Sequence, residues 1–237
     1  MNYTIAAYLF FSAILSGFSV FLFKINNRTL KLILSFSGAY LFAICVLHLI
    51  PETYSGQDKL IGVFILIGFF LQVFLELFSE GIEHGHIHKH SNGVYPFLMM
   101  TGLSIHSFLE GIPLANRFSI TLNDIKVYDY SLVYGIIMHN IPVAIALMSM
   151  LMQSGIKKTN SLLSLLFFSG MAPLGMLTSV LVGENIALSS DRVMAIVIGI
   201  FLHISTTILF ESSENHRFNL IKFLTIILGA GIALISL

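Results

Sequence analysis

The stretch His106-Ser107-Phe108-Leu109-Glu110-Gly111-Ile112-Pro113 places two metal-ligating side chains inside an apolar run, residues 95–115, that is long enough to cross a bilayer as a helix. His106 and Glu110 stand four residues apart, so they share one face of that helix. A carboxylate at membrane depth costs about 2.5–3.5 kcal/mol on insertion scales. Packing does not offset this cost, whereas a divalent cation bound by both side chains would. The stretch therefore predicts a membrane-spanning helix that carries part of a metal site.

A second stretch, His139-Asn140-Ile141-Pro142-Val143-Ala144, repeats the pattern inside the next apolar run, residues 130–152. Both stretches read as histidine, a small polar residue, two spacers, a fifth position and a small residue. The fifth position is Glu110 in the first copy and Val143 in the second. Because helices joined by short connections tend to be neighbours, two imidazoles and one carboxylate are expected to meet.

The composition of the chain is that of a membrane protein. The 237 residues are 56% hydrophobic and 10% charged, with a mean hydropathy of +0.90. A soluble domain carries about 25% charged residues, so soluble, nucleic-acid-binding and disordered classes are excluded. The single cysteine, Cys45, rules out a disulfide framework.

The apolar runs predict an all-α membrane protein with eight transmembrane helices, organised as a single domain over residues 1–237. No basic segment precedes the first run, so it is expected to be a retained span and not a signal peptide. The predicted spans are residues 3–23, 30–50, 60–78, 95–115, 130–152, 162–182, 193–210 and 220–237. In the sixth span, Gly170 and Gly175 are expected to permit close helix contact.

The distribution of basic residues in the connections predicts the orientation. The odd-numbered connections carry eight Lys and Arg residues and the even-numbered connections carry four. The odd-numbered connections are therefore expected in the cytoplasm, with both termini on the other side of the membrane.

Four further side chains are candidate auxiliary metal ligands. His48 and Glu52 stand four apart at the end of the second span, where they are either vestibule ligands or an interfacial histidine beside a solvated carboxylate. His203 and Glu211 lie in and just after the seventh span. They are either part of an exit route for an ion or ordinary interior and loop residues.

The third connection, residues 79–94, is rich in histidine. Imidazoles at every second position line one side of an extended segment, which predicts a weak cytoplasmic metal reservoir or sensor, the alternative being a merely polar loop. These residues are His84, His86, His88 and His90.

On these motifs the chain resembles the ZIP family of divalent metal transporters. The resemblance implies eight spans with inverted repeats, termini outside, a histidine-rich loop between the third and fourth helices, and a metal site between the fourth and fifth. The fourth-helix pattern His-Asn-x-x-Glu/Asp-Gly corresponds to His106 through Gly111, and the fifth-helix pattern His/Gln-x-x-Pro-Glu-Gly corresponds to His139 through Ala144. The match is specific at the first motif and partial at the second.

The departures from the family pattern reduce the number of acidic ligands. Val143 and Ala172 stand where many members carry carboxylates, and Ser107 replaces an asparagine. The resemblance then implies a mononuclear site at most. His106, Glu110 and His139 would be its ligands, with Ser107, Asn140 or water completing the shell.

Three functions are compatible with this site. The first is uptake of a divalent cation into the cytoplasm across the plasma (inner) membrane, by a protein that is not an enzyme. Zinc suits two imidazoles and a carboxylate best, and iron(II), cobalt or manganese are accepted too. The second is a metal-binding relative that does not transport, such as a sensor. The third is an intramembrane zinc hydrolase that also uses His203. Small-residue helix faces are compatible with a homodimer.

Overall fold

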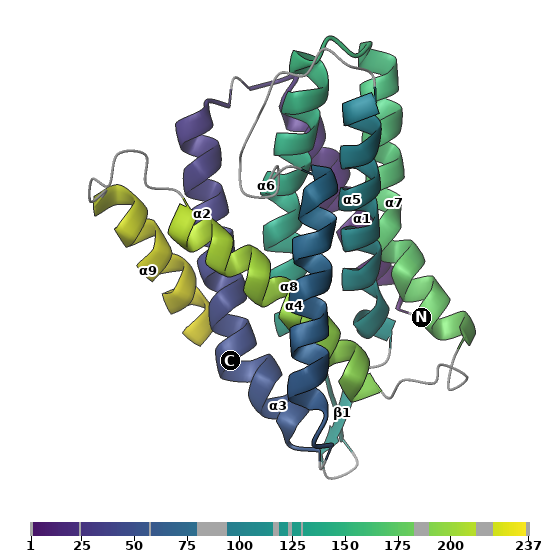
Figure 1. The fold of residues 1–237 in the computed structure, drawn as a ribbon, viewed down its shortest axis with the longest axis vertical. Coiled ribbons are helices and arrows are strands. Elements are labelled where there is room, and N and C mark those ends of the chain that lie inside the picture. Colours follow the sequence, from purple (N-terminus) through teal and green to yellow (C-terminus); the bar gives the residue numbers. More distant parts are fainter. Residues whose placement is uncertain are drawn as a thin grey trace.

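The computed structural model is a bundle of helices with one short hairpin at an end (Figure 1). It describes residues 2–23, 25–56, 58–79, 94–115, 119–122, 125–128, 130–182, 190–211 and 220–235. The helices are α1 (Tyr3–Ser19), α2 (Asn27–Ile44), the π-helix η1 (Cys45–Leu49), α3 (Ile50–Tyr54), α4 (Ile61–Ser79), α5 (Val94–Gly111), the 3₁₀-helix η3 (Ile112–Ala115), α6 (Ser131–Gln153), α7 (Lys158–Val182), α8 (Ser190–Glu211) and α9 (Leu220–Ile235). The strands are β1 (Ser119–Leu122) and β2 (Ile125–Tyr128).

Six of the helical segments are long and apolar enough to cross a membrane, which makes the chain an integral membrane protein with six candidate spans. Two of them are compound: α2, η1 and α3 continue as one segment, Asn27–Tyr54, and η3 extends α5 to Ala115. Helices α1 and α9, with 17 and 16 residues, are shorter than the about 20 residues that a 30 Å hydrocarbon core requires. The predicted all-helical membrane architecture is confirmed, while the count of eight spans and the inverted repeats stay predictions.

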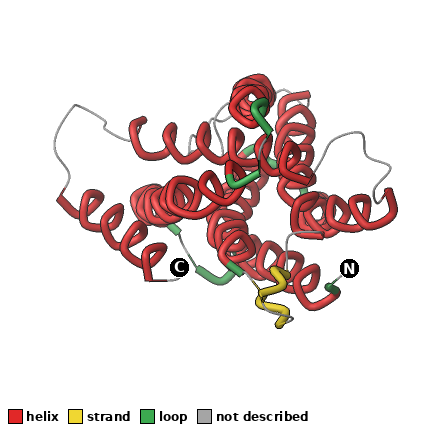
Figure 2. The backbone as a smooth tube through the Cα atoms, turned by 90° about the horizontal axis from the view of Figure 1, so that it is seen from below, coloured by secondary structure: helices red, strands yellow, loops and turns green. Residues whose placement is uncertain are grey.

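The helices pack in two groups. Helices α2, α4, α8 and α9 form one group, and α1, α5, α6 and α7 form the other; the groups meet where α2 packs on α6 and α4 on α5. The view along the bundle shows the helix axes inclined to one another (Figure 2). Helix α6 is the most enclosed candidate span, with 72% of its apolar window buried against 22% for α4. Most residues on α6 are therefore shielded from lipid, whereas most residues on α4 are at least partly exposed.

Local sequence signals fix several helix ends. The side chains of Asn2 and Asn26 accept hydrogen bonds from the backbone N–H groups of Thr4 and Thr29 and cap α1 and α2. After α6 the chain turns at Gly155, whose φ of 75° is readily adopted only by glycine. There the N–H of Ile156 donates to the carbonyl of Leu151, which closes the helix end before α7 begins.

The π-helix η1 relieves the backbone strain that Pro51 would otherwise cause in this helical segment. Pro51 has no N–H and its ring crowds the carbonyl four residues earlier, so an ordinary helix would be strained there. Just before it the N–H of Ile50 donates to the carbonyl of Cys45, five residues back, and the turn is widened. This wide turn carries His48.

Glycines let particular helix pairs approach to backbone contact. A Cβ atom added at Gly199 of α8 would overlap the carbonyl oxygen of Ile65 of α4, and one added at Gly175 of α7 would overlap that of Phe108 of α5. The expected packing role of Gly175 is thus confirmed. For Gly170 that expectation is wrong, because a Cβ there meets no atom of the described residues within 4 Å.

The hairpin β1–β2 is the one departure from an all-helical fold among the described residues. The strands pair antiparallel, with Ser119 opposite Tyr128 and Leu122 opposite Ile125. The sequence contains the signal for it, since two stretches that alternate apolar and polar residues are separated by only two residues. In Figure 1 the hairpin lies at the same end of the bundle as α3.

An ion pair joins the N-terminal ends of α4 and α8. The Nε of Arg192 donates to Oδ2 of Asp58 over 2.7 Å, and the guanidinium lies 5.3 Å from the centre of the Phe64 ring. The hydrogen bond from Arg192, followed by one from the backbone N–H of Leu60, holds the pKa of Asp58 below its usual value.

Replacing Asp58 with asparagine is therefore expected to lower stability in a pH-dependent way. A carboxyl whose folded pKa is lowered contributes stability above its unfolded pKa, and this contribution is lost as the pH falls through the folded pKa. The difference in thermal unfolding between wild type and Asp58→Asn should be full at neutral pH and disappear in acid. A difference independent of pH would contradict this role, and Lys59→Gln serves as a neighbouring control.

Candidate metal centre

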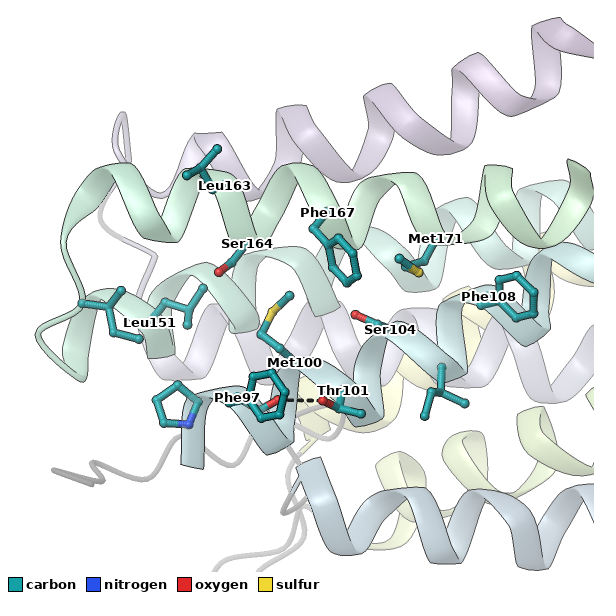
Figure 3. A pocket seen from close by; sticks show the side chains of 13 residues that line it. Phe97, Met100, Thr101, Ser104, Phe108, Leu151, Leu163, Ser164, Phe167 and Met171 are labelled. Atoms are coloured by element: carbon teal, nitrogen blue, oxygen red, sulfur yellow. Dashed lines mark hydrogen bonds between the residues drawn. The ribbon is translucent and has the colours of Figure 1, made fainter. Parts of the chain in front are cut away.

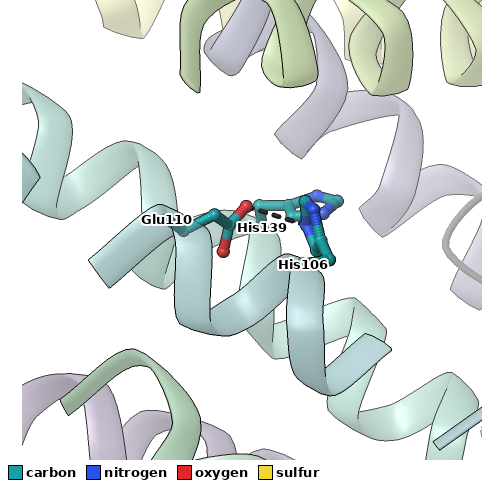
Figure 4. Close-up of side chains that lie close together, drawn as sticks. All are labelled: His106, Glu110 and His139. Carbon is teal, nitrogen blue, oxygen red and sulfur yellow. Dashed lines mark ion pairs between the residues drawn. The ribbon is translucent and has the colours of Figure 1, made fainter. Parts of the chain in front are cut away.

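Three buried side chains converge between α5 and α6 (Figure 4). His106 and Glu110 come from α5 and His139 from α6, and one ligand atom of each lies within 4.8 Å of those of the other two. The Nε2 atom of His106 is 2.9 Å from Oε1 of Glu110, and the two imidazole rings are 5.9 Å apart and nearly perpendicular. The convergence predicted from sequence is thus present in the structure.

The burial of this group is nearly complete. The exposed fractions are 1% for His106 and 0% for both Glu110 and His139. The Oε2 atom of Glu110 accepts no hydrogen bond from any described residue. An incompletely satisfied buried carboxylate is unfavourable, so a positive ligand at this point would remove a penalty as well as form bonds. Imidazole nitrogen and carboxylate oxygen are the donor types that zinc takes.

His106, Glu110 and His139 fill a space between α5 and α6 that arises from the way these helices pack on their neighbours. Helix α5 packs closely on α7 and α4, and α6 packs on α1 and α2, whereas the α5 and α6 backbones approach each other less closely. Long side chains from α5 and α6 therefore bridge the interval between them. Pro142 lies inside α6 close to His139, and its missing N–H leaves a backbone carbonyl of that helix without its usual partner.

A fourth side chain, which the sequence analysis did not single out, orients the centre from the other helix group. Gln72 of α4 is fully buried, and its Oε1 lies 3.2 Å from Nδ1 of His106. When Nδ1 carries the proton and donates to this amide oxygen, Nε2 of the same ring presents its lone pair toward Glu110. Such outer hydrogen bonds commonly fix the tautomer and orientation of a metal-ligating histidine. The signal in the sequence is a single amide in a helix whose other residues, apart from Glu76 and Ser79, are apolar.

Replacing Gln72 with methionine is expected to weaken zinc binding by about tenfold, because the loss of an outer hydrogen bond costs about 10- to 100-fold in affinity. Methionine keeps the length of the side chain and removes the acceptor. Gln72→Glu, which keeps an acceptor oxygen, is the matched control. Equilibrium competition with a zinc-chelating dye measures both, and equal affinities for the two variants would contradict this orienting role.

The positions beside the three side chains add few donors. Ser107 and Asn140 are both buried, and Oδ1 of Asn140 accepts no hydrogen bond from the described residues. Val143 is fully buried among apolar neighbours, and the backbone of Ala172 lies directly against Gly111. The described part of the chain thus brings a single carboxylate to this group.

The other predicted ligands lie elsewhere. His48 and Glu52 face each other over 3.8 Å and remain partly exposed. His203 pairs with Glu76 of α4 and not with His106 or His139. The side chain of Glu211 and the histidine-rich residues His84, His86, His88 and His90 lie outside the described residues. As metal ligands all of these stay predictions.

A pocket of about 750 Å³ lies on the other side of α5, between α5 and α7 (Figure 3). Its walls include Phe97, Phe108 and Phe167, and no charged side chain of the described residues lines it. Ser104, which contributes to the wall, stands two residues from His106 and so projects from a nearly opposite side of the helix. This pocket suits an apolar group and is separate from the metal-ligating side chains.

The fold and the buried group together define an integral membrane protein with an intramembrane centre fit for a divalent cation. The family model of the ZIP zinc transporters matches residues 83–237, more than half of the chain. The chain belongs to the ZIP family, whose members are transporters and not enzymes, and the hydrolase alternative is thereby set aside.

Similarity to a curated protein agrees with this assignment. The chain is 29% identical to Protein zntD of Dictyostelium discoideum over 177 aligned positions, in a match that covers 67% of this chain and 25% of that protein. The chain therefore spans about a quarter of the length of that relative.

Proposed function

We propose that this protein carries a divalent metal cation, zinc first and iron(II) or manganese next, across a membrane into the cytoplasm. The observation that supports this most directly is the buried convergence of His106, Glu110 and His139 within a membrane bundle. Membership of the ZIP family supports transport as the purpose of that centre.

The cation would bind singly and be released readily. Two neutral imidazoles and one carboxylate leave a net charge of +1 once a divalent ion is bound, so a second cation at the same point would be repelled. Ser107, Asn140 or water would complete the shell. A centre with few anionic ligands binds its ion less tightly than one rich in carboxylates. Weaker binding suits a transporter, because it has to release the ion on the other side of the membrane.

The orientation is supported by the basic residues in the connections, whose excess on the odd-numbered side favours a cytoplasmic histidine-rich loop and both termini outside. Uptake into the cytoplasm across the plasma (inner) membrane is the part of the proposal that rests on the ZIP family alone. Eight spans in one unit would then require α1 and α9 to cross as short or extended segments. A homodimer is compatible with the glycine-bearing helix faces.

A second function, metal sensing without transport, is favoured by one specific observation. Val143 occupies the position of a ligand carboxylate in the family pattern and is fully buried among apolar residues. A chain that binds a cation at this centre and never releases it to the other side would retain the three ligands and lack flux.

Zinc flux into proteoliposomes with an enclosed zinc-responsive dye separates these functions. Wild-type protein is expected to fill the vesicles, and His106→Ala and His139→Ala are expected to abolish the flux. Thr225→Ala, which removes an exposed polar side chain on α9 away from the centre, is the control. Saturable zinc binding without flux in the wild type would favour the sensor, and flux indifferent to both centre variants would remove this centre from the function.

A further inference from the structure

A second pair of side chains able to bind a metal is formed by Glu76 of α4 and His203 of α8, and Glu76 lies on the same face of α4 as Gln72. Gln72 and Glu76 stand four residues apart on α4, so they occupy one side of that helix, about 6 Å apart along its axis. Gln72 reaches His106 of the metal centre, and Glu76 reaches His203 of α8. One stripe of polar side chains thus leads from the metal centre toward the end of α4.

The geometry of this pair is well defined. The Nε2 atom of His203 lies 2.7 Å from Oε2 of Glu76, and Phe69 packs edge-on against the imidazole with 4.9 Å between ring centres. The Glu76 side chain is 26% exposed and that of His203 11%, whereas the side chains of the metal centre are almost fully enclosed. The pair is therefore less enclosed than the centre, and Glu76 stands only three residues before the end of α4 at Ser79.

The contact between α4 and α8 does not depend on this pair. The two backbones already touch at Gly68 and Gly199, and Asp58, just before α4, pairs with Arg192 in the first turn of α8. A carboxylate within this apolar candidate span carries an insertion cost that simple packing does not require. Intramembrane ionisable pairs of this kind often mark the route of an ion.

We propose that Glu76 and His203 form a relay site that receives the divalent cation after it leaves His106, Glu110 and His139. This inference rests on the proposed transport function. The donors, one carboxylate and one imidazole, are of the same chemical types as those of the centre, and water fills the remaining positions. Two protein ligands hold a cation more loosely than three, so the ion moves on toward the end of α4. Glu76 and His203 are hydrogen-bonded to each other in this structure, and an arriving cation takes the place of this hydrogen bond.

Glu76→Gln tests the relay with little disturbance of structure, because the amide oxygen still accepts a hydrogen bond from His203. Flux into proteoliposomes is expected to fall by at least about tenfold, because even the loss of an outer hydrogen bond costs a metal site about 10- to 100-fold and Glu76 is proposed as a direct ligand. Zinc affinity at the centre and the thermal unfolding temperature are expected to stay as in wild type. The exchanged pair Glu76→His with His203→Glu restores both donor types and is expected to recover flux.

Two results would overturn the relay. The first is normal flux in Glu76→Gln, which would leave the pair with only a structural role. The second is anomalous scattering from zinc-soaked wild-type crystals that shows an ion at His106, Glu110 and His139 and none at Glu76 and His203. Crystals without an ion at the centre would count against the proposed function itself, so the two failures are distinguishable.

Discussion

Replacing Glu110 with glutamine is expected to weaken zinc binding by at least about 100-fold and to stop transport. Loss of outer hydrogen bonds alone costs metal sites about 10- to 100-fold, and Glu110 is the single carboxylate that the described residues bring within direct reach of the ion. Glutamine matches glutamate in shape, so the change removes charge and leaves packing intact. Competition with a chelating dye gives the affinity, and the proteoliposome assay gives the flux.

Glu52→Gln is the matched control for this change. Glu52 also stands four residues after a histidine, but its pair with His48 is partly exposed and spans 3.8 Å. It is expected to keep the affinity of the centre. If Glu110→Gln bound zinc as tightly as wild type, the ion would have to sit elsewhere, and the convergence in Figure 4 would be a hydrogen-bonded interior cluster.

Replacing Gly199 with alanine is expected to destabilise the fold by about 1–3 kcal/mol or more, the range for overfilled contacts. The added Cβ would overlap the carbonyl oxygen of Ile65, and backbone cannot swing aside as a side chain can. Helices α4 and α8 must separate or slide to relieve this overlap. Thermal unfolding in detergent, followed by helical circular dichroism, measures the effect.

Gly170→Ala is the control, because its expected effect on stability has the opposite sign. A Cβ at this position of α7 meets no described atom within 4 Å, and alanine in a helix is favoured over glycine by about 0.5–1 kcal/mol. This variant should therefore be as stable as wild type or more so. Equal losses from both variants would mean that the α4–α8 contact is looser than the structure describes.

The centre could be predicted from sequence because its signals are local. His106 and Glu110 share a helix face by spacing alone, and the repeat of the motif at His139 points to the next helix. The membrane class follows from composition and apolar run length in the same way. Each of these inferences needs only the geometry of one helix and short connections.

The remaining features depend on contacts between segments far apart in the chain. Gln72 meets His106 across 34 residues, and Glu76 meets His203 across 127, so no spacing rule reveals either pair. The difference between Gly170 and Gly175 depends on which backbone lies opposite each glycine. The hairpin is a different case. Its two strands do show the alternating pattern in the sequence, but they are short, and the longer apolar runs on either side dominate the prediction.

The hydrogen bond between Gln72 and His106 joins the two helix groups at the ring that would bind the ion. Any motion that carries α5 away from α4 must break this bond and release the imidazole from its fixed orientation. The affinity for the cation and the relative position of the groups are then thermodynamically linked, and the linkage is reciprocal. An ion that prefers the oriented ring also favours the joined arrangement, and a rearrangement that parts the groups loosens the ion.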